Sequence, residues 1–275
     1  MKLGIDLGGT NMRVGLVAGD TIIAKEIVPC PSRESENVVL EALASLIERN
    51  MTPDVDGIGI GVPTLVDSVR GIVYNATNIP SWREVHLKDF IAGRFGVEVA
   101  VNNDANCFAL GEARFGAGRD CGGLVGVTLG TGVGGGLVVD GKLYSGRNTG
   151  AAEIGELPFR THNFEYYCSS VFFEREYGIS GKDAAAAARA GDVAMQAVWR
   201  EFGTSVGTLM KAVMFAYDPD VIVIGGGIAS AFELYQPAMI QELSSFPYPE
   251  SLRNIRIEPS RLVDVAILGA AALNL

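Results

Sequence analysis

The sequence predicts an α/β protein with two similar domains, and three observations lead to this prediction. A unit of strand, glycine turn, strand and second turn occurs at residues 4–20 and again at 126–142. A repeat half a chain apart is typical of two related domains rather than of a solenoid. Strand-like and helix-like runs alternate, which favours parallel strands. The 275 residues are enough for two domains.

The first half opens with a strand from Lys2 that ends in a glycine turn before Arg13. Apolar alternation and turn residues predict further strands at 14–17, 21–29, 56–62 and 97–101. Apolar residues at helical spacing predict helices at 35–49, 87–95 and 107–115, while 71–82 is expected to be a loop. Glycines alternate with apolar residues in the 56–62 strand, so we expect another backbone to approach it closely.

The second half follows the same plan. A hairpin is expected at 123–144, and an irregular polar stretch at 145–167. Helices are predicted at 171–177, 183–189 and 193–216, then a buried strand at 221–224, a glycine turn leading into a helix, a strand at 255–259 and a last helix at 265–275.

The first glycine turn has the composition of a phosphate site. Gly8 and Gly9 lack a Cβ and let an anion approach the backbone, and their N–H groups, the hydroxyl of Thr10 and the cation of Arg13 can bind it. Asp6 would repel that phosphate unless a Mg²⁺ ion lay between them, usually through water. A plain hairpin with a solvated Asp is the alternative for this stretch taken alone.

The second copy strengthens the phosphate interpretation. Gly130, Thr131 and Gly132 repeat the first turn, so two such hairpins could hold a nucleotide polyphosphate between the domains. Thr128 replaces the aspartate of the first copy, which leaves the metal-side carboxylate to the first half. Gly225, Gly226 and Gly227 lie between a buried strand and a helix, where backbone can face a nucleotide or where packing alone can require glycine.

Composition excludes several function classes. The net charge of −10 argues against nucleic acid and anionic membranes as partners. The four cysteines show no paired spacing, as expected of thiols in a reduced cytoplasm. The strand that starts at Lys2 leads us to expect no signal peptide and therefore a cytoplasmic protein.

Seven motifs in order resemble the repressor–open reading frame–kinase (ROK) sugar kinases of the actin-like ATPase superfamily. They are the first phosphate hairpin, Gly59–Pro63, Asn102–Asn106, Gly130–Gly132, Ala152–Gly155, Gly225–Gly227 and Gly269–Ala271. The resemblance covers the whole chain. It implies two actin-like (ribonuclease H-like) domains with an inter-domain cleft, one formed by 1–115 plus 265–275 and the other by 116–264. It also implies ATP, Mg²⁺ and a homodimer.

The resemblance assigns the catalytic base to Asp104. Phosphoryl transfer to a hydroxyl needs a carboxylate within hydrogen-bond reach of that hydroxyl, and Asp104 follows a predicted strand. Its other possible role is as a helix N-cap, and both roles can hold. The sugar contacts implied by the family are Asn78, Asn103, Glu153 and Glu165.

One region departs from the family, which usually has a histidine and three cysteines that bind a structural zinc ion. Here Glu156 stands in place of the histidine, and His162 has no cysteines around it. One His and the distant Cys168 cannot form a four-ligand site, so we expect no structural zinc. Glu156 is expected either to contact the sugar or to pair with Arg160.

The sequence thus predicts an ATP-dependent kinase that phosphorylates the 6-hydroxyl of a hexose, with glucose as the first expectation. N-acetylmannosamine, N-acetylglucosamine and fructose are alternative substrates. A non-catalytic sugar sensor descended from a kinase is the alternative from another class of function, and a filament protein is a third.

Overall fold

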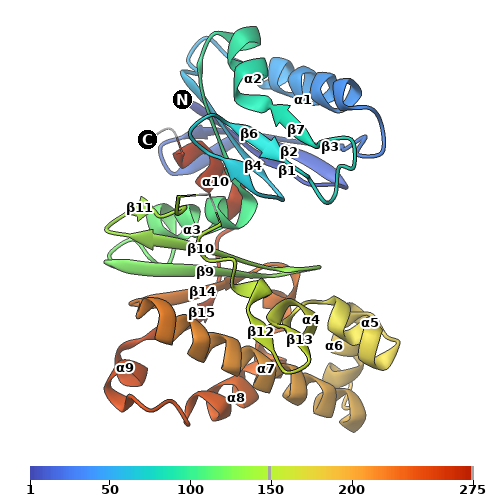
Figure 1. Ribbon diagram of the computed structural model, residues 1–275, viewed down its shortest axis with the longest axis vertical. Helices are drawn as coiled ribbons and strands as arrows, with labels where there is room; N and C mark the ends of the chain where they lie inside the picture. Colours follow the sequence, from blue (N-terminus) through green and yellow to red (C-terminus); the bar gives the residue numbers. More distant parts are fainter. Residues whose placement is uncertain (148–149, 274–275) are drawn as a thin grey trace. The chain divides into compact units, whose positions relative to one another are not determined.

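The computed structural model describes residues 1–147 and 150–273. Its contacts divide the chain into two compact units, which Figure 1 shows coloured along the sequence. Unit 1 comprises Met1–Asp120, Gly136–Ala151 and Arg261–Leu275, and unit 2 comprises Cys121–Gly135 and Ala152–Ser260. The domain bounds implied by the resemblance stay a prediction.

Unit 1 is built on a five-stranded sheet in the order β3-β2-β1-β4-β8. The strands are β1 (Lys2–Leu7), β2 (Asn11–Ala18), β3 (Thr21–Pro29), β4 (Gly57–Val62) and β8 (Glu98–Asn103). The first three form an antiparallel meander, whereas β1, β4 and β8 are parallel. The carboxyl ends of the three parallel strands therefore meet at one edge of the sheet, where ligands of α/β proteins usually bind.

Side-chain alternation gives the two faces of this sheet different characters. Leu3 and Ile5 of β1 pack with α1 (Glu36–Asn50) and α2 (Leu87–Phe95) in one apolar core. On the other face Gly4 and Gly59 lie directly under α10 (Val265–Ala272). A Cβ atom on either glycine would collide with the backbone of α10. The expected close approach of another backbone to β4 is thus confirmed, and that backbone is α10.

Helix α3 (Asp104–Phe115) packs against α10, with Gly269 of α10 close to the carbonyl of Cys107. The region expected to be a loop at 71–82 contains part of a small sheet, β5-β6-β7. Its strands are β5 (Val66–Asp67), β6 (Ile72–Tyr74) and β7 (Glu84–His86). Strands of two or three residues are too short for periodicity to reveal them, so the expectation of a loop was wrong at 72–74.

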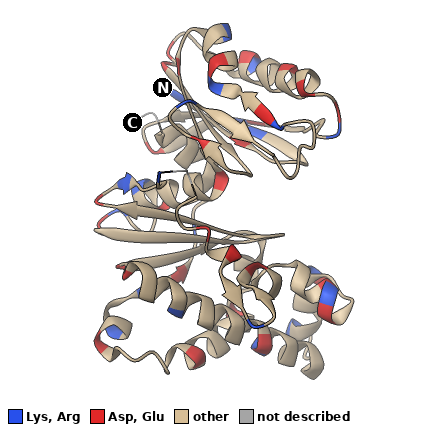
Figure 2. Cartoon of the chain, viewed as in Figure 1, with Lys and Arg blue, Asp and Glu red and all other residues tan. Residues whose placement is uncertain are grey.

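Unit 2 contains the central strands of a second sheet, whose order is β11-β10-β9-β14-β15. The parallel strands are β9 (Gly123–Leu129), β14 (Val221–Gly225) and β15 (Arg256–Pro259), and β10 (Val133–Val139) and β11 (Lys142–Leu143) continue the hairpin. No residue of β9 or β14 is charged, and Figure 2 shows both strands in tan, as expected for strands covered on both faces.

Helices make up most of the rest of unit 2. They are α4 (Phe164–Cys168), α5 (Val171–Tyr177), α6 (Gly181–Arg189), α7 (Val193–Tyr217), α8 (Phe232–Leu243) and α9 (Pro249–Asn254), with 3₁₀ turns at Ile154–Glu156 and Gly227–Ala231. Buried rings of Phe173, Trp199, Phe202 and Tyr235 pack together between them, with centroids 4.5 Å apart for Phe173 and Trp199.

Three sequence predictions for elements need correction or limits. Helix α3 begins at Asp104 rather than at 107, because Asn103 caps it. The stretch 145–167 is not wholly irregular, since it holds α4 and the short strands β12 (Pro158–Phe159) and β13 (His162–Asn163). Helix α10 ends at Ala272, and residues 274–275 of the predicted helix lie outside the described residues.

In the part of the chain that the structure describes, no helix has both the length and the apolar character needed to cross a membrane.

Replacing Gly59 by Ala tests the backbone contact beneath α10. The added Cβ would meet the carbonyl oxygen of Ala270, which is backbone and cannot rotate away. We expect the free energy of unfolding to fall by about 1–3 kcal/mol or more, measured by urea denaturation followed by circular dichroism. Gly93→Ala is the matched control, because nothing lies within 4 Å of its Cβ position. In a helix this change should stabilise by about 0.5–1 kcal/mol. Equal effects of the two variants would refute the account.

Candidate active site

Four positions form a row across the first sheet, next to its carboxyl edge. In the strand registers Asp6 pairs with Arg13 on one side and with Gly61 on the other, and Gly61 pairs with Asn102. Laterally paired residues point to the same face of a sheet. This row continues the face that carries α10, so Asp6 lies on the same side of the sheet as α3.

Asp6 and Arg13 form an ion pair, with 3.1 Å between Asp6 Oδ2 and an Arg13 guanidinium nitrogen. The side chain of Asp6 is 19% exposed. Burial raises the pKa of Asp6 above its ordinary value, Arg13 opposes that rise, and Asp264 adds to it. A partly buried carboxylate at a strand end is a suitable ligand for Mg²⁺, which proteins often hold by one carboxylate together with substrate phosphates.

The glycine turn of the first hairpin differs in one detail from the expectation. The N–H of Gly8 donates to the carbonyl of Asn11 at 2.9 Å and so closes the turn. It is therefore not free for a phosphate, which leaves Gly9 and the exposed Thr10 as the turn residues that could contact one. A Cβ on Gly9 would lie 2.5 Å from Asn78 Cβ. The loop that carries Asn78 thus reaches the phosphate turn.

Asp104 is the first residue of α3, and Asn103 is its N-cap. Asn103 Oδ1 accepts hydrogen bonds from the backbone N–H groups of Ala105 at 2.9 Å and Asn106 at 3.3 Å. Asp104 Oδ1 accepts from the Ala105 N–H at 2.8 Å. The capping role weighed for Asp104 therefore falls mainly on Asn103, which is in the extended conformation usual for a cap.

Asp104 and Asp6 lie near each other in unit 1. A Cβ on Gly61 would lie 3.6 Å from Asp104 Cα and 3.1 Å from Cys107 Sγ, and Gly61 is the ladder partner of Asp6. Burial raises the pKa of the Cys107 thiol well above its ordinary value, and the charges of Asp104 and Asp6 add to this rise. The structure therefore brings together the two carboxylates to which the sequence assigned the base and the metal-side roles.

Asn102 and Asn106 are buried, and no role was assigned to them from the sequence. Asn102 Oδ1 accepts from the Asn103 N–H at 2.8 Å and from Asn106 Nδ2 at 2.9 Å. Two asparagines four residues apart across a strand–helix junction are the signal that could have indicated this pair. It holds the residues on both sides of Asp104.

The glycine turns of unit 2 lie side by side at the ends of two parallel strands. Gly130 follows β9, and its N–H donates to the carbonyl of Gly132 at 2.9 Å, as Gly8 does in the first copy. Gly226, with φ 82°, packs against the backbone of Leu129, so a side chain there would collide with β9. The structure therefore brings residues 130–132 and 225–227 together. Thr131, which lies between Gly130 and Gly132, is exposed.

The three glutamates of the expected sugar site also belong to unit 2. Glu165 Oε2 accepts from the Val133 N–H at 3.0 Å and contacts Gly132, which ties this carboxylate to the second glycine turn. The pKa of Glu153 is raised mainly by desolvation and to a smaller extent by repulsion from Glu156 and Glu165, although part of its side chain is accessible. Ala152 before it has φ 64°, a conformation that costs energy for a non-glycine residue and is found often at functional sites.

Glu156 does not pair with Arg160, contrary to one of the two expectations for it. Its Oε2 accepts from Asn163 Nδ2 at 3.1 Å. Arg160 lies instead 5.0 Å from the centroids of the Phe159 and Tyr167 rings, and 3.7 Å from a carboxylate oxygen of Glu201.

Aromatic contacts hold the segment where the family usually binds zinc. The rings of Phe159 and Phe164 stack with centroids 4.6 Å apart, and Tyr167 packs edge-on against Phe159 at 5.4 Å. The hydroxyls of Thr161 and Tyr167 are 2.8 Å apart. Among the described residues, no group of three or more His, Cys, Asp or Glu is arranged to hold a metal ion.

A polar hollow of about 400 Å³ opens beside Glu165. It is lined by His162, Asn163, Glu165, Tyr166 and Arg175. The His162 and Tyr166 rings stack at 4.0 Å, and the Arg175 guanidinium lies 5.0 Å from the Tyr166 centroid. The hollow is open to solvent and mainly polar.

The raised pKa of Asp6 makes a prediction about stability and pH. A carboxyl group whose pKa is higher in the folded state than in the unfolded state stabilises the fold at pH values below its ordinary pKa. This stabilisation is lost as the pH rises through the raised pKa. At neutral pH the ionised Asp6 therefore lowers stability. We expect Asp6→Asn to unfold at higher urea concentration than the wild type at neutral pH, with the difference shrinking under acid. A less stable variant at neutral pH would contradict this.

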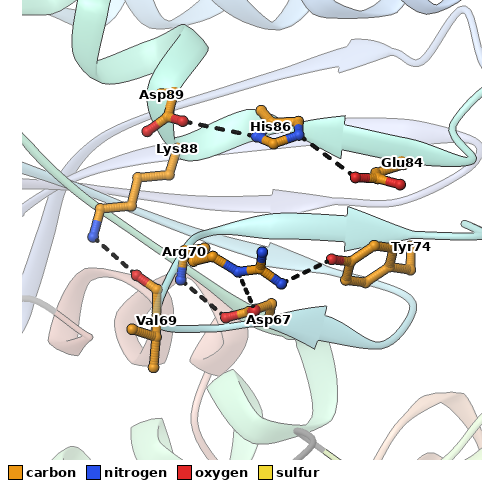
Figure 3. A network of polar contacts seen from close by, with 8 residues as sticks. All are labelled: Asp67, Val69, Arg70, Tyr74, Glu84, His86, Lys88 and Asp89. Carbon is orange, nitrogen blue, oxygen red and sulfur yellow. Dashed lines mark hydrogen bonds and ion pairs between the residues drawn. The ribbon is translucent and has the colours of Figure 1, made fainter.

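Asp67→Asn serves as a control, because its effect on stability at neutral pH should be opposite to that of Asp6→Asn. Hydrogen bonds from the backbone and the guanidinium of Arg70 hold the pKa of Asp67 below its ordinary value (Figure 3). This variant should be less stable than the wild type at neutral pH, and the difference should vanish as acid protonates Asp67.

The aromatic contacts around Phe159 predict that folding needs no metal. Protein dialysed against EDTA should contain far less than one zinc per chain by atomic emission, and its unfolding midpoint should equal that of undialysed protein. Retention of one zinc per chain would show that a metal site exists.

Comparison with known proteins connects this geometry to a family. The model of the ROK family matches residues 2–275. The chain is 31% identical over 304 residues to a glucokinase of Thermotoga maritima, with 98% of this chain and 96% of the relative covered. It is 31% identical over 311 residues to an N-acetyl-D-glucosamine kinase of Yersinia enterocolitica, with 100% and 99% covered.

Solved structures agree with the sequence comparison. A ROK family glucokinase from Streptomyces griseus, in complex with glucose and AMPPNP, matches with a TM-score of 0.85 and 29% identity. The match covers 99% of this chain and 98% of that chain. The predicted fold class, α/β with two actin-like domains, is confirmed. Since the family model spans nearly the whole sequence, the chain belongs to the ROK family.

Proposed function

We propose that this protein transfers the γ-phosphoryl group of ATP to the 6-hydroxyl of a hexose, with glucose as the preferred substrate. The relatives are named sugar kinases and match this chain over nearly their full length, which supports an ATP-dependent sugar kinase. The solved neighbour holds glucose and an ATP analogue together.

The observation that carries the proposal is the position of Asp104 beside Asp6 in unit 1. Asp104 starts a capped helix at the carboxyl edge of the sheet. Gly61 lies between Asp104 and Asp6, and its lack of a side chain lets the two come close. Phosphoryl transfer needs one carboxylate as the base for the sugar hydroxyl and a second one on the metal side of the phosphates. The two must be different residues that lie close together. A sensor without catalysis would need neither carboxylate.

In the proposed reaction Asp104 accepts the proton of the 6-hydroxyl as its oxygen attacks the γ-phosphorus. The bond to the β-phosphate oxygen breaks, and ADP and a hexose 6-phosphate leave. The phosphates are proposed to contact Gly9, Thr10 and Arg13 together with the glycine turns of unit 2. When bound at Asp6, Mg²⁺ would neutralise phosphate charge.

The sugar is proposed to bind through Asn78, Asn103, Glu153, Glu156 and Glu165. Carboxylates can accept hydrogen bonds from two neighbouring hydroxyls, and the amide of Asn103, whose Oδ1 already caps α3, can still donate through Nδ2. Glu156 enters this set because its contact is Asn163 rather than Arg160, so its carboxylate faces the same segment as the hollow.

A second substrate, N-acetylglucosamine, is favoured by the polar hollow. The resemblance places this loop near the C1 and C2 groups of the sugar, and about 400 Å³ beside Glu165 gives room for a substituent larger than a hydroxyl. The Yersinia relative is named for this substrate. ADP release measured with a panel of hexoses and N-acetylhexosamines separates the two. A homodimer remains a prediction from the resemblance, and a cytoplasmic location remains a prediction from the sequence.

Asp104→Asn tests the assignment of the base. An amide keeps the shape of the side chain but cannot accept the hydroxyl proton, so kcat should fall by at least about 100-fold. Sugar binding, measured by calorimetry, should stay within about threefold because binding does not need the base.

Asp89→Asn is the matched control, since this aspartate lies 76% exposed on α2. Its kcat should equal that of the wild type. If Asp104→Asn retained turnover within about tenfold of the wild type, a barrier change of about 1.4 kcal/mol, Asp104 would not be the base.

A further inference from the structure

Thr64 lies in the turn after β4 and contacts two other segments of unit 1. Its backbone carbonyl accepts a hydrogen bond from Asn103 Nδ2 at 3.2 Å. Its hydroxyl lies 2.8 Å from the carbonyl oxygen of Tyr74 and 3.3 Å from that of Asn75. A hydroxyl carries one proton, so the shorter contact is the main hydrogen bond.

On one side Thr64 holds the segment that carries Asp104. Oδ1 of Asn103 caps α3, and one N–H of its Nδ2 donates to Thr64, which leaves the second N–H of Nδ2 for the sugar. The Asn103 side chain therefore cannot rotate without losing either the cap of α3 or the hydrogen bond to Thr64. A cap bond contributes about 1 kcal/mol, so the first turn of α3 is fixed relative to Thr64.

On the other side Thr64 holds the base of the loop that carries Asn78. This loop is closed by hydrogen bonds from Asn75 N–H to the Arg83 carbonyl and from Ala76 N–H to the Trp82 carbonyl, both 2.9 Å. Asn75 has φ 46°, a left-handed conformation that asparagine adopts more readily than most residues.

The side chain of Tyr74 is held by residues other than Thr64, whose hydroxyl contacts Tyr74 only at the backbone carbonyl. The Tyr74 hydroxyl accepts from the Arg70 guanidinium at 3.3 Å, and Arg70 in turn pairs with Asp67 at 2.7 Å (Figure 3). The ring is thus fixed by the small sheet β5-β6-β7, which leaves the carbonyl of Tyr74 to the Thr64 hydroxyl.

We propose that Thr64 is a positioning residue, which keeps the loop of Asn78 in a fixed place relative to the Asn103–Asp104 turn. The proposal rests on the proposed kinase function, in which Asn78 and Asn103 bind the sugar and Asp104 takes its proton. Thr64 itself need not touch the sugar. Loss of its hydroxyl leaves the bond between its carbonyl and Asn103 in place, so sugar binding should suffer more than the chemical step.

Thr64→Val, which keeps the shape of the side chain, and Thr64→Ser, which loses only the methyl group, test this. Val removes the hydroxyl, and Ser keeps it. We expect Thr64→Val to raise KM for the sugar about tenfold. The kcat should stay within about twofold of the wild type, and KM for ATP should rise less than KM for the sugar, because the loop only touches the phosphate turn at Gly9. Thr64→Ser should restore KM for the sugar. Unchanged sugar KM in Thr64→Val, an equal rise in both KM values, or no rescue by Ser would overturn the proposal.

Thr208→Val is the matched control. Thr208 is a half-buried threonine in α7 whose hydroxyl also donates to a backbone carbonyl, that of Thr204 at 3.2 Å. This variant removes the same kind of bond and should leave both KM values unchanged. A purely structural role of Thr64 would make the two Val variants behave alike.

Amide hydrogen exchange gives a readout that does not depend on turnover. In Thr64→Val the N–H groups of Asn75 and Ala76 should exchange about tenfold faster than in Thr64→Ser, and those of α7 should not change. Equal exchange in the two variants would overturn the positioning role. If the wild type turned over no sugar in the panel, the proposed function would fail, and the exchange result would still decide what Thr64 holds.

Discussion

The contact of α10 with the glycine-lined face of the first sheet is the constraint on which the candidate site depends. Gly4 and Gly59 leave no room for a side chain beneath α10. Because α10 packs this closely, α3 packs beside it in turn. Gly61 then brings the start of α3 next to the strand that carries Asp6. The spacing between the proposed base and the proposed metal-side carboxylate thus follows from backbone contacts rather than from a flexible loop.

The two glycine hairpins share a backbone design and differ in chemistry. In each the first glycine N–H closes its own turn, at Gly8 and at Gly130. Only the first has a carboxylate before the turn, since Thr128 takes the position of Asp6 in the second. In unit 2 the turn is tied to Glu165, and the nearby hairpin is held by aromatic rings and Arg160. These rings supply packing in a segment where the family usually uses a metal.

Much of the fold could be predicted because its elements carry strong periodicity. The strand at 21–29 and the helix at 87–95 have the predicted bounds. The strand at 72–74 could not be found, since three residues carry no period. The start of α3 was placed too late because Asn and Asp favour turns as well as helix caps. The motif residues of the site could be named. The bond that occupies the Gly8 N–H depends on the exact geometry of its turn, and the Glu201 partner of Arg160 arises from a tertiary contact.

The most direct test is a crystal structure of the protein with glucose, Mg²⁺ and a non-hydrolysable ATP analogue. The account predicts that the sugar 6-hydroxyl oxygen lies within about 3 Å of an Asp104 carboxylate oxygen. It also predicts that the phosphates contact the turn at 9–10 and that the metal lies on the side of Asp6. A sugar bound with its 6-hydroxyl toward another carboxylate, or phosphates away from that turn, would contradict it.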